Sequence, residues 1–447
     1  MKPAPTTHRG LRTKDFLARG GLWGFALKLA SVVLVFAGEA MITNHLGLES
    51  YDLWATAVSW LSIAAVFSVL GMNMLIVQRL PAARVSSDFS AMRSLIGWTG
   101  ARILAAGFVC GLALFLARDL LSTSRPALGP ILLVVALMVP VRGSALHLQA
   151  VLRGLKHPLV SQAPLMLVRP FALLLALVLL SAAGMSWSLQ RLALVWLATL
   201  VLAWLVGRLW LMRLTEPQLR DAIPGGVEPR WRGLVVQFFA LQLAGMLLTQ
   251  ADPAMLAAFS TPGEAGLYAI ADRLSLLLLF AQIAVNVVIA PLISQLHTSG
   301  DKTELQGALV VAARGIAAFT LPAAVFMLLF GPWLLGFFGD DFVQAHSALK
   351  WLVLGRTWAA LSGAVVLLLV MTGHQKTALK ILLSSALGKL LLNVALIPSL
   401  GAEGAAISTA LMLALCNSWS LFEVHRRLGL SSSVFIILSR NERQGSS

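Results

Sequence analysis

The stretch GLKHPLVSQAPLMLVRPFALLLALVLL, residues 154–180, joins a short basic turn to an apolar run that is long enough to cross a membrane. Arg169 lies near the middle of this run, and a weaker copy, GHQKTALKILLSSALGKLLLNVALI, begins at Gly373 and holds Lys389 in the same place. The cation follows the opening glycine by 15 residues in one copy and by 16 in the other. A cation at the bilayer centre costs about 3 kcal/mol on insertion scales, so such residues usually face a bundle interior or a water-filled cavity. Two of them at matching places predict a central cavity lined with positive charge.

The composition indicates a helical membrane protein. Of 447 residues, 58% are hydrophobic and only 12% are charged, which excludes an ordinary soluble domain. No segment alternates in the way that a membrane barrel requires. The formal net charge of +15 reflects loops that face the cytoplasm rather than a nucleic-acid partner. The two cysteines lie inside apolar runs and predict neither a disulfide nor a metal site, and no motif predicts a cofactor.

We predict an all-α polytopic membrane protein with about twelve transmembrane helices. The spans cover roughly 21–45, 53–77, 95–117, 128–152, 159–182, 189–212, 233–258, 267–296, 309–335, 346–371, 376–399 and 402–425. Lys and Arg residues collect in cytoplasmic loops, and here about 21 fall on one side against 3 (Arg118, Arg125 and Arg191) on the other. Both termini are therefore expected in the cytoplasm.

A faint internal repeat divides the chain into two six-helix lobes. Besides the stretches at Gly154 and Gly373, Leu53-Trp54-Ala55 aligns with Leu267-Tyr268-Ala269. Parallel repeats of this kind are related by a pseudo-two-fold axis along the membrane normal. The longest polar connection, which has three prolines and a Gly-Gly pair, separates the two lobes. The expected organisation is a first lobe with its tail at 1–212, a linker at 213–232, a second lobe at 233–425 and a cytoplasmic tail at 426–447.

Seven basic residues inside the predicted spans are candidates for binding an anionic substrate. They are Lys28 and Arg102 in the cytoplasmic half, Arg142, Arg169 and Lys389 near the middle, and Arg273 and Arg356 in the outer part. Arginine forms bidentate bonds to phosphate oxygens and lysine acts as a point charge, so these cations predict the passage of a phosphate head group. Two alternatives stay open, because Arg273 could neutralise Asp252 or Asp272, and Arg102 could form a structural pair within the first lobe.

Three carboxylates lie towards the outer side of the spans. They are Glu39, Asp252 and Asp272. Ionisable groups inside a membrane mark ion pathways and proton relays. These three are therefore candidates for coupling transport to a proton or sodium gradient, with facilitated diffusion as the alternative.

Helix breakers accompany two of the central cations. Pro140 comes two residues before Arg142, and Pro170 directly follows Arg169. Proline removes a backbone hydrogen bond and tends to kink its helix. We therefore expect these helices to be bent beside the binding cations.

The chain also carries an ordered series of loose motifs. The first half holds LGLESYDLWATAVSWL (46–61) and LGMNMLIVQRL (70–80), and the second half holds TQADPAMLAAFSTPGEAGLYAIADRLS (249–275), NVVIAPLISQL (286–296), FFGDDFVQAHSALKWL (337–352) and NVALIPSLGAEGAAISTAL (393–411). Their order resembles the polysaccharide transporter family, the O-antigen-type lipid-linked oligosaccharide flippases of the multidrug/oligosaccharidyl-lipid/polysaccharide exporter (MOP) superfamily. Asp52 stands where members of the family often have glycine, so we expect that hairpin to be tighter or differently capped.

This resemblance covers roughly residues 20–428 and implies two six-helix lobes around a central cavity that opens alternately to either side. It also implies a bacterial inner membrane. The implied cargo is an undecaprenyl-pyrophosphate-linked oligosaccharide, moved from the cytoplasmic to the periplasmic leaflet, and a glycan polymerase is a candidate partner. Twelve spans rather than fourteen argue against the lipid II flippase branch.

Two other functions stay open. A cation-coupled multidrug exporter of the same superfamily shares the architecture but is expected to favour acids over basic residues in its cavity. A polytopic glycosyltransferase or polymerase would need an external loop large enough for an active site, and the external loops here have about ten residues or fewer. We therefore expect a transporter rather than an enzyme.

Overall fold

The computed structural model describes residues 7–123, 125–226, 229–299 and 301–430, and every regular element within these ranges is a helix. Nine helices of this described part are long and apolar enough to cross a membrane, or ten if the bent pair Asp340–Leu361 and Val365–Met371 counts as one broken span. The predicted all-α polytopic class is confirmed. The ends of the two predicted tails, residues 1–6 and 431–447, lie outside the described residues.

The first half of the chain forms the helices that precede the linker. They are α1 (Thr7–Val69), α2 (Met72–Val85), α3 (Phe89–Leu121), η1 (Pro126–Leu128), α4 (Gly129–Gly154), α5 (Pro158–Ala163), the π-helical η2 (Pro164–Val168), α6 (Arg169–Ala182) and α7 (Leu189–Leu214). The linker contains the short α8 (Pro217–Asp221).

The second half follows the same broad plan. Its helices are α9 (Pro229–Phe259), α10 (Glu264–Leu276), η3 (Leu277–Leu279), α11 (Phe280–Ser299), α12 (Lys302–Gly336), η4 (Asp340–Ala345), α13 (His346–Leu361), α14 (Val365–Met371) and α15 (Gln375–Leu428). Long helices suit a lipid environment, because all their backbone groups are bonded within the segment.

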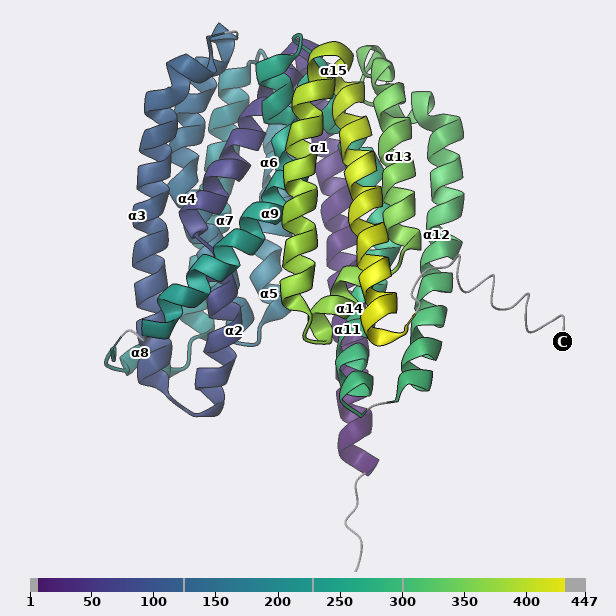
Figure 1. Ribbon diagram of the computed structural model, residues 1–447. Coiled ribbons are helices and arrows are strands. Elements are labelled where there is room, and N and C mark those ends of the chain that lie inside the picture. Colours follow the sequence, from purple (N-terminus) through teal and green to yellow (C-terminus); the bar gives the residue numbers. More distant parts are fainter. Residues whose placement is uncertain (1–6, 124, 227–228, 300, 431–447) are drawn as a thin grey trace, which may run out of the picture.

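Two glycines turn α1 and α15 back on themselves. Gly47 has φ 75° and ψ 175°, and Gly401 has φ 52° and ψ −130°, conformations that glycine adopts at little cost. Each of these two helices therefore crosses the bundle, reverses and returns, as α15 does in Figure 1. Each contains two of the predicted spans, so the structure is consistent with about twelve crossings.

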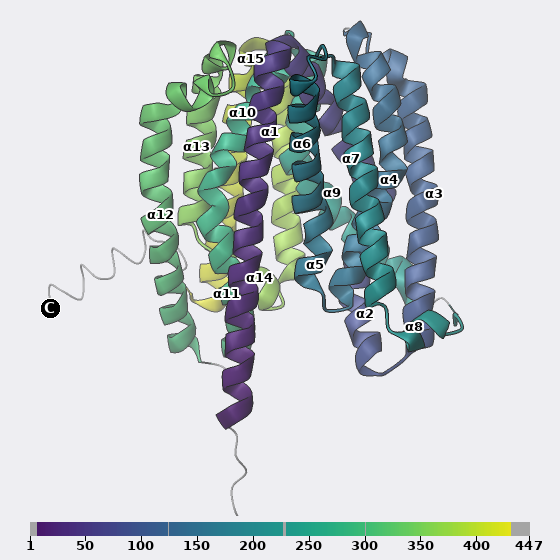
Figure 2. The same ribbon diagram turned by 180° about the vertical axis from the view of Figure 1, so that it is seen from behind.

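The bundle has two ends, which we name after what lies there. The Gly47 end holds the turns at Gly47 and Gly401, and the tail end is where α1 begins and α15 ends (Figures 1 and 2). A start and a finish at one end agree with an even number of crossings. On the predicted orientation, the tail end faces the cytoplasm and the Gly47 end faces the other side of the membrane.

The two halves share one large hydrophobic core at the Gly47 end, whereas towards the tail end the cluster of the first half takes in only the beginning of α9 from the second half. Tyr51 and Trp54 of α1 are buried there together with Tyr268 of α10 and Phe342 of η4. Near the tail end, two separate clusters form, one from α2, α3, α4 and α7 and the other from α11, α12, α14 and α15. The halves are therefore joined at the Gly47 end. The beginning of α9 packs with the first half, through residues such as Trp231, while the division into lobes at 213–232 stays a prediction.

Candidate functional site

The Gly47 end is closed by a buried ion pair that reaches across the two halves. Asp52 and Arg125, 1% and 6% exposed, form a salt bridge within the first half. The Arg125 guanidinium also donates to the carbonyl oxygens of Ser260 (3.3 Å) and Thr261 (3.1 Å) in the second half. Asp52 Oδ1 accepts a hydrogen bond from the backbone N–H of Gly266 at 3.1 Å. Asp52 thus binds the first turn of α10 in the second half, while the expectation of a tighter or differently capped hairpin at Asp52 stays a prediction.

Further contacts hold the same end together. The Asn44 side-chain amide donates to the Phe337 carbonyl oxygen at 3.0 Å, and the rings of Tyr51 and Phe342 meet edge-on with centroids 5.5 Å apart. All four residues lie at the contact between α1 and the end of α12 with η4. We call the contacts of Asp52, Arg125 and Asn44 at the Gly47 end the seal. Charge counts and periodicity did not predict it, although Asp52 and Arg125 were opposite charges predicted on one side of the membrane.

The three predicted carboxylates each form an ion pair with one of the predicted cations. The pairs are Glu39–Arg273, Asp252–Lys389 and Asp272–Arg356. The alternative in which Arg273 neutralises Asp252 or Asp272 is therefore replaced by a pair with Glu39. This pair joins α1 of the first half to α10 of the second half, whereas the other two lie within the second half.

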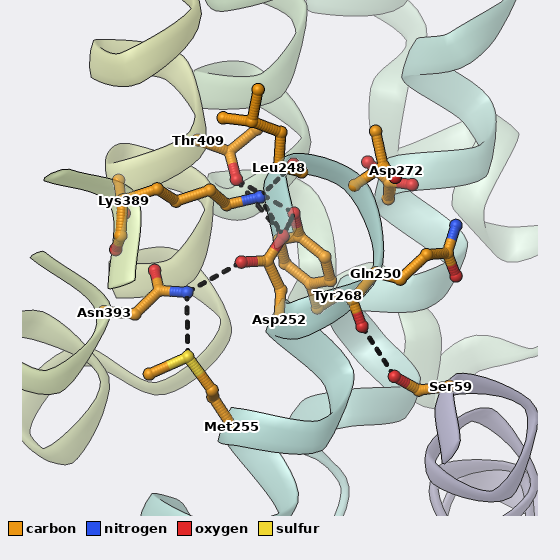
Figure 3. A network of polar contacts seen from close by, with 12 residues as sticks. Ser59, Leu248, Gln250, Asp252, Met255, Tyr268, Asp272, Lys389, Asn393 and Thr409 are labelled. Carbon is orange, nitrogen blue, oxygen red and sulfur yellow. Dashed lines mark hydrogen bonds and ion pairs between the residues drawn. The ribbon is translucent and has the colours of Figure 1, made fainter. Parts of the chain in front are cut away.

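Lys389 and Asp252 lie at the centre of a dry polar network between α15 and α9 (Figure 3). Both are only 1% exposed, and Lys389 Nζ lies 2.7 Å from Asp252 Oδ2. The side chains of Asn393 (2.8 Å), Tyr268 (2.5 Å) and Thr409 (3.3 Å) also donate to this carboxylate, and Lys389 donates to a backbone carbonyl of α9. A buried pair with this many partners is fully satisfied. In this conformation Lys389 is bound by the protein itself.

Arg169 follows directly after a local distortion of its helix. Pro164–Val168 forms a π-helical turn, and the Arg169 N–H donates to the carbonyl oxygen of Pro164. Such turns often occur at functional sites, and the flanking Pro164 and Pro170 each lack the backbone N–H that an α-helix would use. The helix is therefore irregular directly before Arg169, while the bends expected beside Arg142 and Arg169 stay predictions.

Arg169 and Arg142 are the two central cations without a carboxylate of their own. Neither takes part in any ion pair within the part of the chain that the structure describes. The Arg169 guanidinium lies over the Trp196 ring, 4.7 Å from its centroid, and its buried Nε has no hydrogen-bond partner among the described atoms. Arg142, Arg273 and Glu39 all lie within electrostatic range of Arg169. This group of half-buried arginines on α4 and α6, Arg142 and Arg169, is called the arginine pair below.

The two cations nearer the tail end also lack acidic partners. Arg102 is exposed, and its guanidinium stacks over the Trp98 ring at 4.3 Å, so its contact within the first lobe is aromatic rather than ionic. Lys28 on α1 is half-buried. For the described residues, no acid lies within ion-pair distance of either. A cationic cavity that these residues line together with the arginine pair stays a prediction.

Among the described residues, no group of three or more His, Cys, Asp or Glu side chains is arranged so that it could bind a metal ion. The chemistry that the site offers is the binding of anions through guanidinium groups in a largely apolar setting.

Comparison with known structures defines the class. A multidrug resistance MATE family transporter of the MOP superfamily in an inward-facing conformation matches with a TM-score of 0.72 and 14% identity over 91% of this chain and 98% of that chain. An outward-facing conformation of such a transporter matches with a TM-score of 0.62 and 13% identity over 96% and 99% of the two chains. The lipid II flippase MurJ, in an inward closed conformation, matches with a TM-score of 0.70 and 14% identity over 90% and 86%. The fold is that of the MOP superfamily of multi-pass membrane transporters.

The family follows from the sequence itself. The family described as "Polysaccharide biosynthesis protein" matches residues 17–297, more than half of the chain, and the chain belongs to that family. The resemblance predicted from the ordered motifs is thereby confirmed. No curated protein matches the chain.

Proposed function

We propose that this protein is a flippase that moves an undecaprenyl-pyrophosphate-linked oligosaccharide from the cytoplasmic to the periplasmic leaflet of a bacterial inner membrane. The observation that carries the proposal is the arginine pair. Three other membrane-embedded cations are neutralised by carboxylates, whereas Arg142 and Arg169 are not. Two unneutralised guanidinium groups within electrostatic range of each other are costly to keep in a membrane protein, and an anionic head group offsets that cost.

A pyrophosphate matches the arginine pair in charge and in hydrogen-bonding chemistry. Guanidinium groups form paired, parallel hydrogen bonds to phosphate oxygens. Two unit charges 4 Å apart attract by about 4 kcal/mol at an effective dielectric constant of about 20. Trp196 holds the Arg169 guanidinium from one side, and Trp54 supports Trp196 with ring centroids 4.7 Å apart. This aromatic support orients Arg169 before any cargo arrives, which lowers the entropy lost on binding.

The closed Gly47 end supports the direction of loading. The lobes are joined there by Asp52, Arg125 and the shared core, and their clusters are separate towards the tail end. The higher TM-score with the inward-facing transporter than with the outward-facing one agrees with this arrangement. On the predicted orientation, the head group would reach the arginine pair from the cytoplasm.

A cation-coupled multidrug exporter is the second candidate, supported by the fold match to MATE transporters. Such a protein would need free carboxylates for a cationic drug. Here Glu39, Asp252 and Asp272 each hold an internal cation in this conformation. The charge pattern therefore favours an anionic cargo, and coupling to a proton or sodium gradient would first have to break one of these pairs. The transporter fold also favours transport over a glycosyltransferase or polymerase activity.

The test is a flipping assay with the purified full chain in proteoliposomes. The probe is a fluorescent polyprenyl-pyrophosphate-linked oligosaccharide, and the readout is its protection from a membrane-impermeant quencher. Arg142→Ala with Arg169→Ala should lower the rate at least tenfold, because the head group would lose both guanidinium partners. Arg118→Ala is the matched control, since Arg118 pairs with Asp119 near the membrane surface. Wild-type flipping by the double variant would refute the proposal.

A second readout works in the cell. Deletion of the gene should cause a lipid-linked oligosaccharide to accumulate on the cytoplasmic face of the inner membrane. Accumulation of no such intermediate, with wild-type resistance to cationic drugs lost instead, would favour the exporter.

A further inference from the structure

The two halves of the chain repeat a three-part arrangement of polar groups. Each has a carboxylate on its first span, a tyrosine on the next that donates to it, and a cation on its fifth span. In the first half these are Glu39, Tyr51 and Arg169, and in the second half Asp252, Tyr268 and Lys389. The chain contains only two tyrosines, and both serve these carboxylates. The two copies lie in corresponding parts of the two halves, although the predicted repeat aligns Tyr268 with Trp54 and not with Tyr51.

The two copies differ in which cation holds the carboxylate. In the second half, Lys389 and Asp252 form a closed pair within one lobe. In the first half, Glu39 is held by Arg273, which comes from the opposite half. Arg169, the counterpart of Lys389, lies within electrostatic range of Glu39, but its Nε is buried without a hydrogen-bond partner among the described atoms. In the second half the carboxylate is thus paired with the cation of its own half. In the first half it is paired with a cation of the opposite half, and Arg169 is left without an ion pair among the described residues.

The helix that carries Glu39 lies between the two competing cations. The α1 helix contacts α6, which begins with Arg169, and α10, which carries Arg273, as Figure 2 shows from behind. The contact with α6 stays within the first half, whereas the contact with α10 crosses between the halves. When the halves move apart at the Gly47 end, Arg273 must leave with the second half.

We propose that Glu39 changes its partner during transport, from Arg273 when the Gly47 end is closed to Arg169 when it is open. This inference rests on the proposed function, and it gives the release step a mechanism. A buried carboxylate without a cation is strongly unfavourable, so Glu39 needs a new partner once Arg273 has gone. Arg169 lies within electrostatic range of Glu39 and forms no ion pair in the part of the chain that the structure describes. Because carboxylate and phosphate compete for the same guanidinium, opening the Gly47 end expels the head group on that side.

The exchange also works in the other direction. Two events that compete for one group affect each other to the same extent. A head group bound to Arg169 leaves Glu39 to Arg273 and so favours the closed Gly47 end. Cargo that arrives from the tail end therefore meets a high-affinity site while the Gly47 end is closed. The affinity of this site falls when the Gly47 end opens.

The test is a cycle of two substitutions in the full chain, purified in nanodiscs, with a polyprenyl pyrophosphate as the probe. Arg273→Ala should weaken binding about tenfold, because Glu39 then turns to Arg169 and competes with the probe. Glu39→Gln alone should leave binding within about twofold of wild type or strengthen it. The double variant, Arg273→Ala with Glu39→Gln, should bind like wild type, since no carboxylate is left to compete. A merely structural role for Arg273 would show the same loss in both backgrounds, and that result would overturn the inference.

A second measurement is independent of cargo. Spin labels at Met185→Cys and Ser399→Cys, two exposed positions at the Gly47 end, report the separation of the halves once Cys110 and Cys416 are replaced by alanine. Arg273→Ala should lengthen this distance, and Arg118→Ala should not. An unchanged distance would also overturn the exchange. If wild type and Arg169→Ala bound the probe equally weakly while the distance lengthened as expected, the proposed function would fail and the partner exchange would stand.

Discussion

Replacing Asp252 by asparagine tests whether Lys389 serves the fold or the cargo. The substitution keeps the size of the side chain but removes the charge that faces the Lys389 ammonium. Both residues are 1% exposed, so water cannot take the place of the lost carboxylate. At the 2.7 Å between Lys389 Nζ and Asp252 Oδ2, the Coulomb attraction is about 6 kcal/mol at an effective dielectric constant of about 20. Removing one partner of a buried pair typically costs about 3–5 kcal/mol, and we expect Asp252→Asn to destabilise the protein by that amount.

The assay compares thermal unfolding in detergent with flipping in proteoliposomes. Asp252→Asn should unfold at a clearly lower temperature, and adding Lys389→Met should recover most of the loss, because replacing both charges leaves neither one unpaired. The double variant should also flip the probe at near the wild-type rate, since the structure pairs Lys389 with the protein itself. A double variant that is as stable as wild type but inactive would refute this reasoning. It would show that Lys389 contacts the cargo, as its depth in the sequence predicts.

Three further predictions concern the turn, the seal and the aromatic support. Gly401→Ala should destabilise the protein by about 1–3 kcal/mol in thermal unfolding, because φ is 52° there and a Cβ would lie 2.5 Å from Glu264 Oε2, whereas Gly307→Ala in open space on α12 should not. Asp52→Asn removes the buried ion pair of the seal. It should therefore slow flipping and raise the reactivity of a cysteine placed at the Gly47 end towards an impermeant reagent. Unchanged reactivity would contradict this prediction. Trp196→Leu should slow flipping about fivefold through the loss of about 1 kcal/mol of cation–π attraction to Arg169, and Trp196→Phe should lose less; equal rates for both would contradict that role.

The helical architecture could be predicted from the sequence, because a membrane allows few other structures for long apolar segments. An apolar run of about 20 residues can only be a helix in lipid, so the spans were readable one by one. The reversals at Gly47 and Gly401, where the backbone leaves the helical conformation, fell within two residues of predicted span edges. A distortion of the helix before Arg169 was also predictable, since two prolines flank this stretch. Its π-helical form was not, because proline can kink a helix in several ways.

Which carboxylate pairs with which cation could not be predicted from the sequence, and the reason is geometric. Depth places Arg273 near Asp272, its neighbour in the chain, yet adjacent residues on a helix point in different directions. Asp272 therefore meets Arg356 of α13, while Arg273 meets Glu39 of α1. Which helix lies beside which face depends on packing between the halves. The burial of Arg125 was not predicted for a related reason. Nothing in the sequence distinguishes a loop arginine that is exposed to solvent from one that the opposite half of the protein covers.

The distribution of pairs between the two halves has a consequence for where the cargo binds. In the second half, Lys389 and Arg356 are matched by Asp252 and Asp272 within the lobe, so that lobe has no central cation to offer. In the first half, Arg142 and Arg169 form no ion pair among the described residues, and Glu39, which lies nearer the outer side, is engaged by Arg273 of the opposite half. A pyrophosphate would therefore bind to the first lobe alone and travel with it. Since the cargo would not bridge the lobes, it would not resist their separation by direct contact, and the only coupling left between binding and opening is the contest for Glu39.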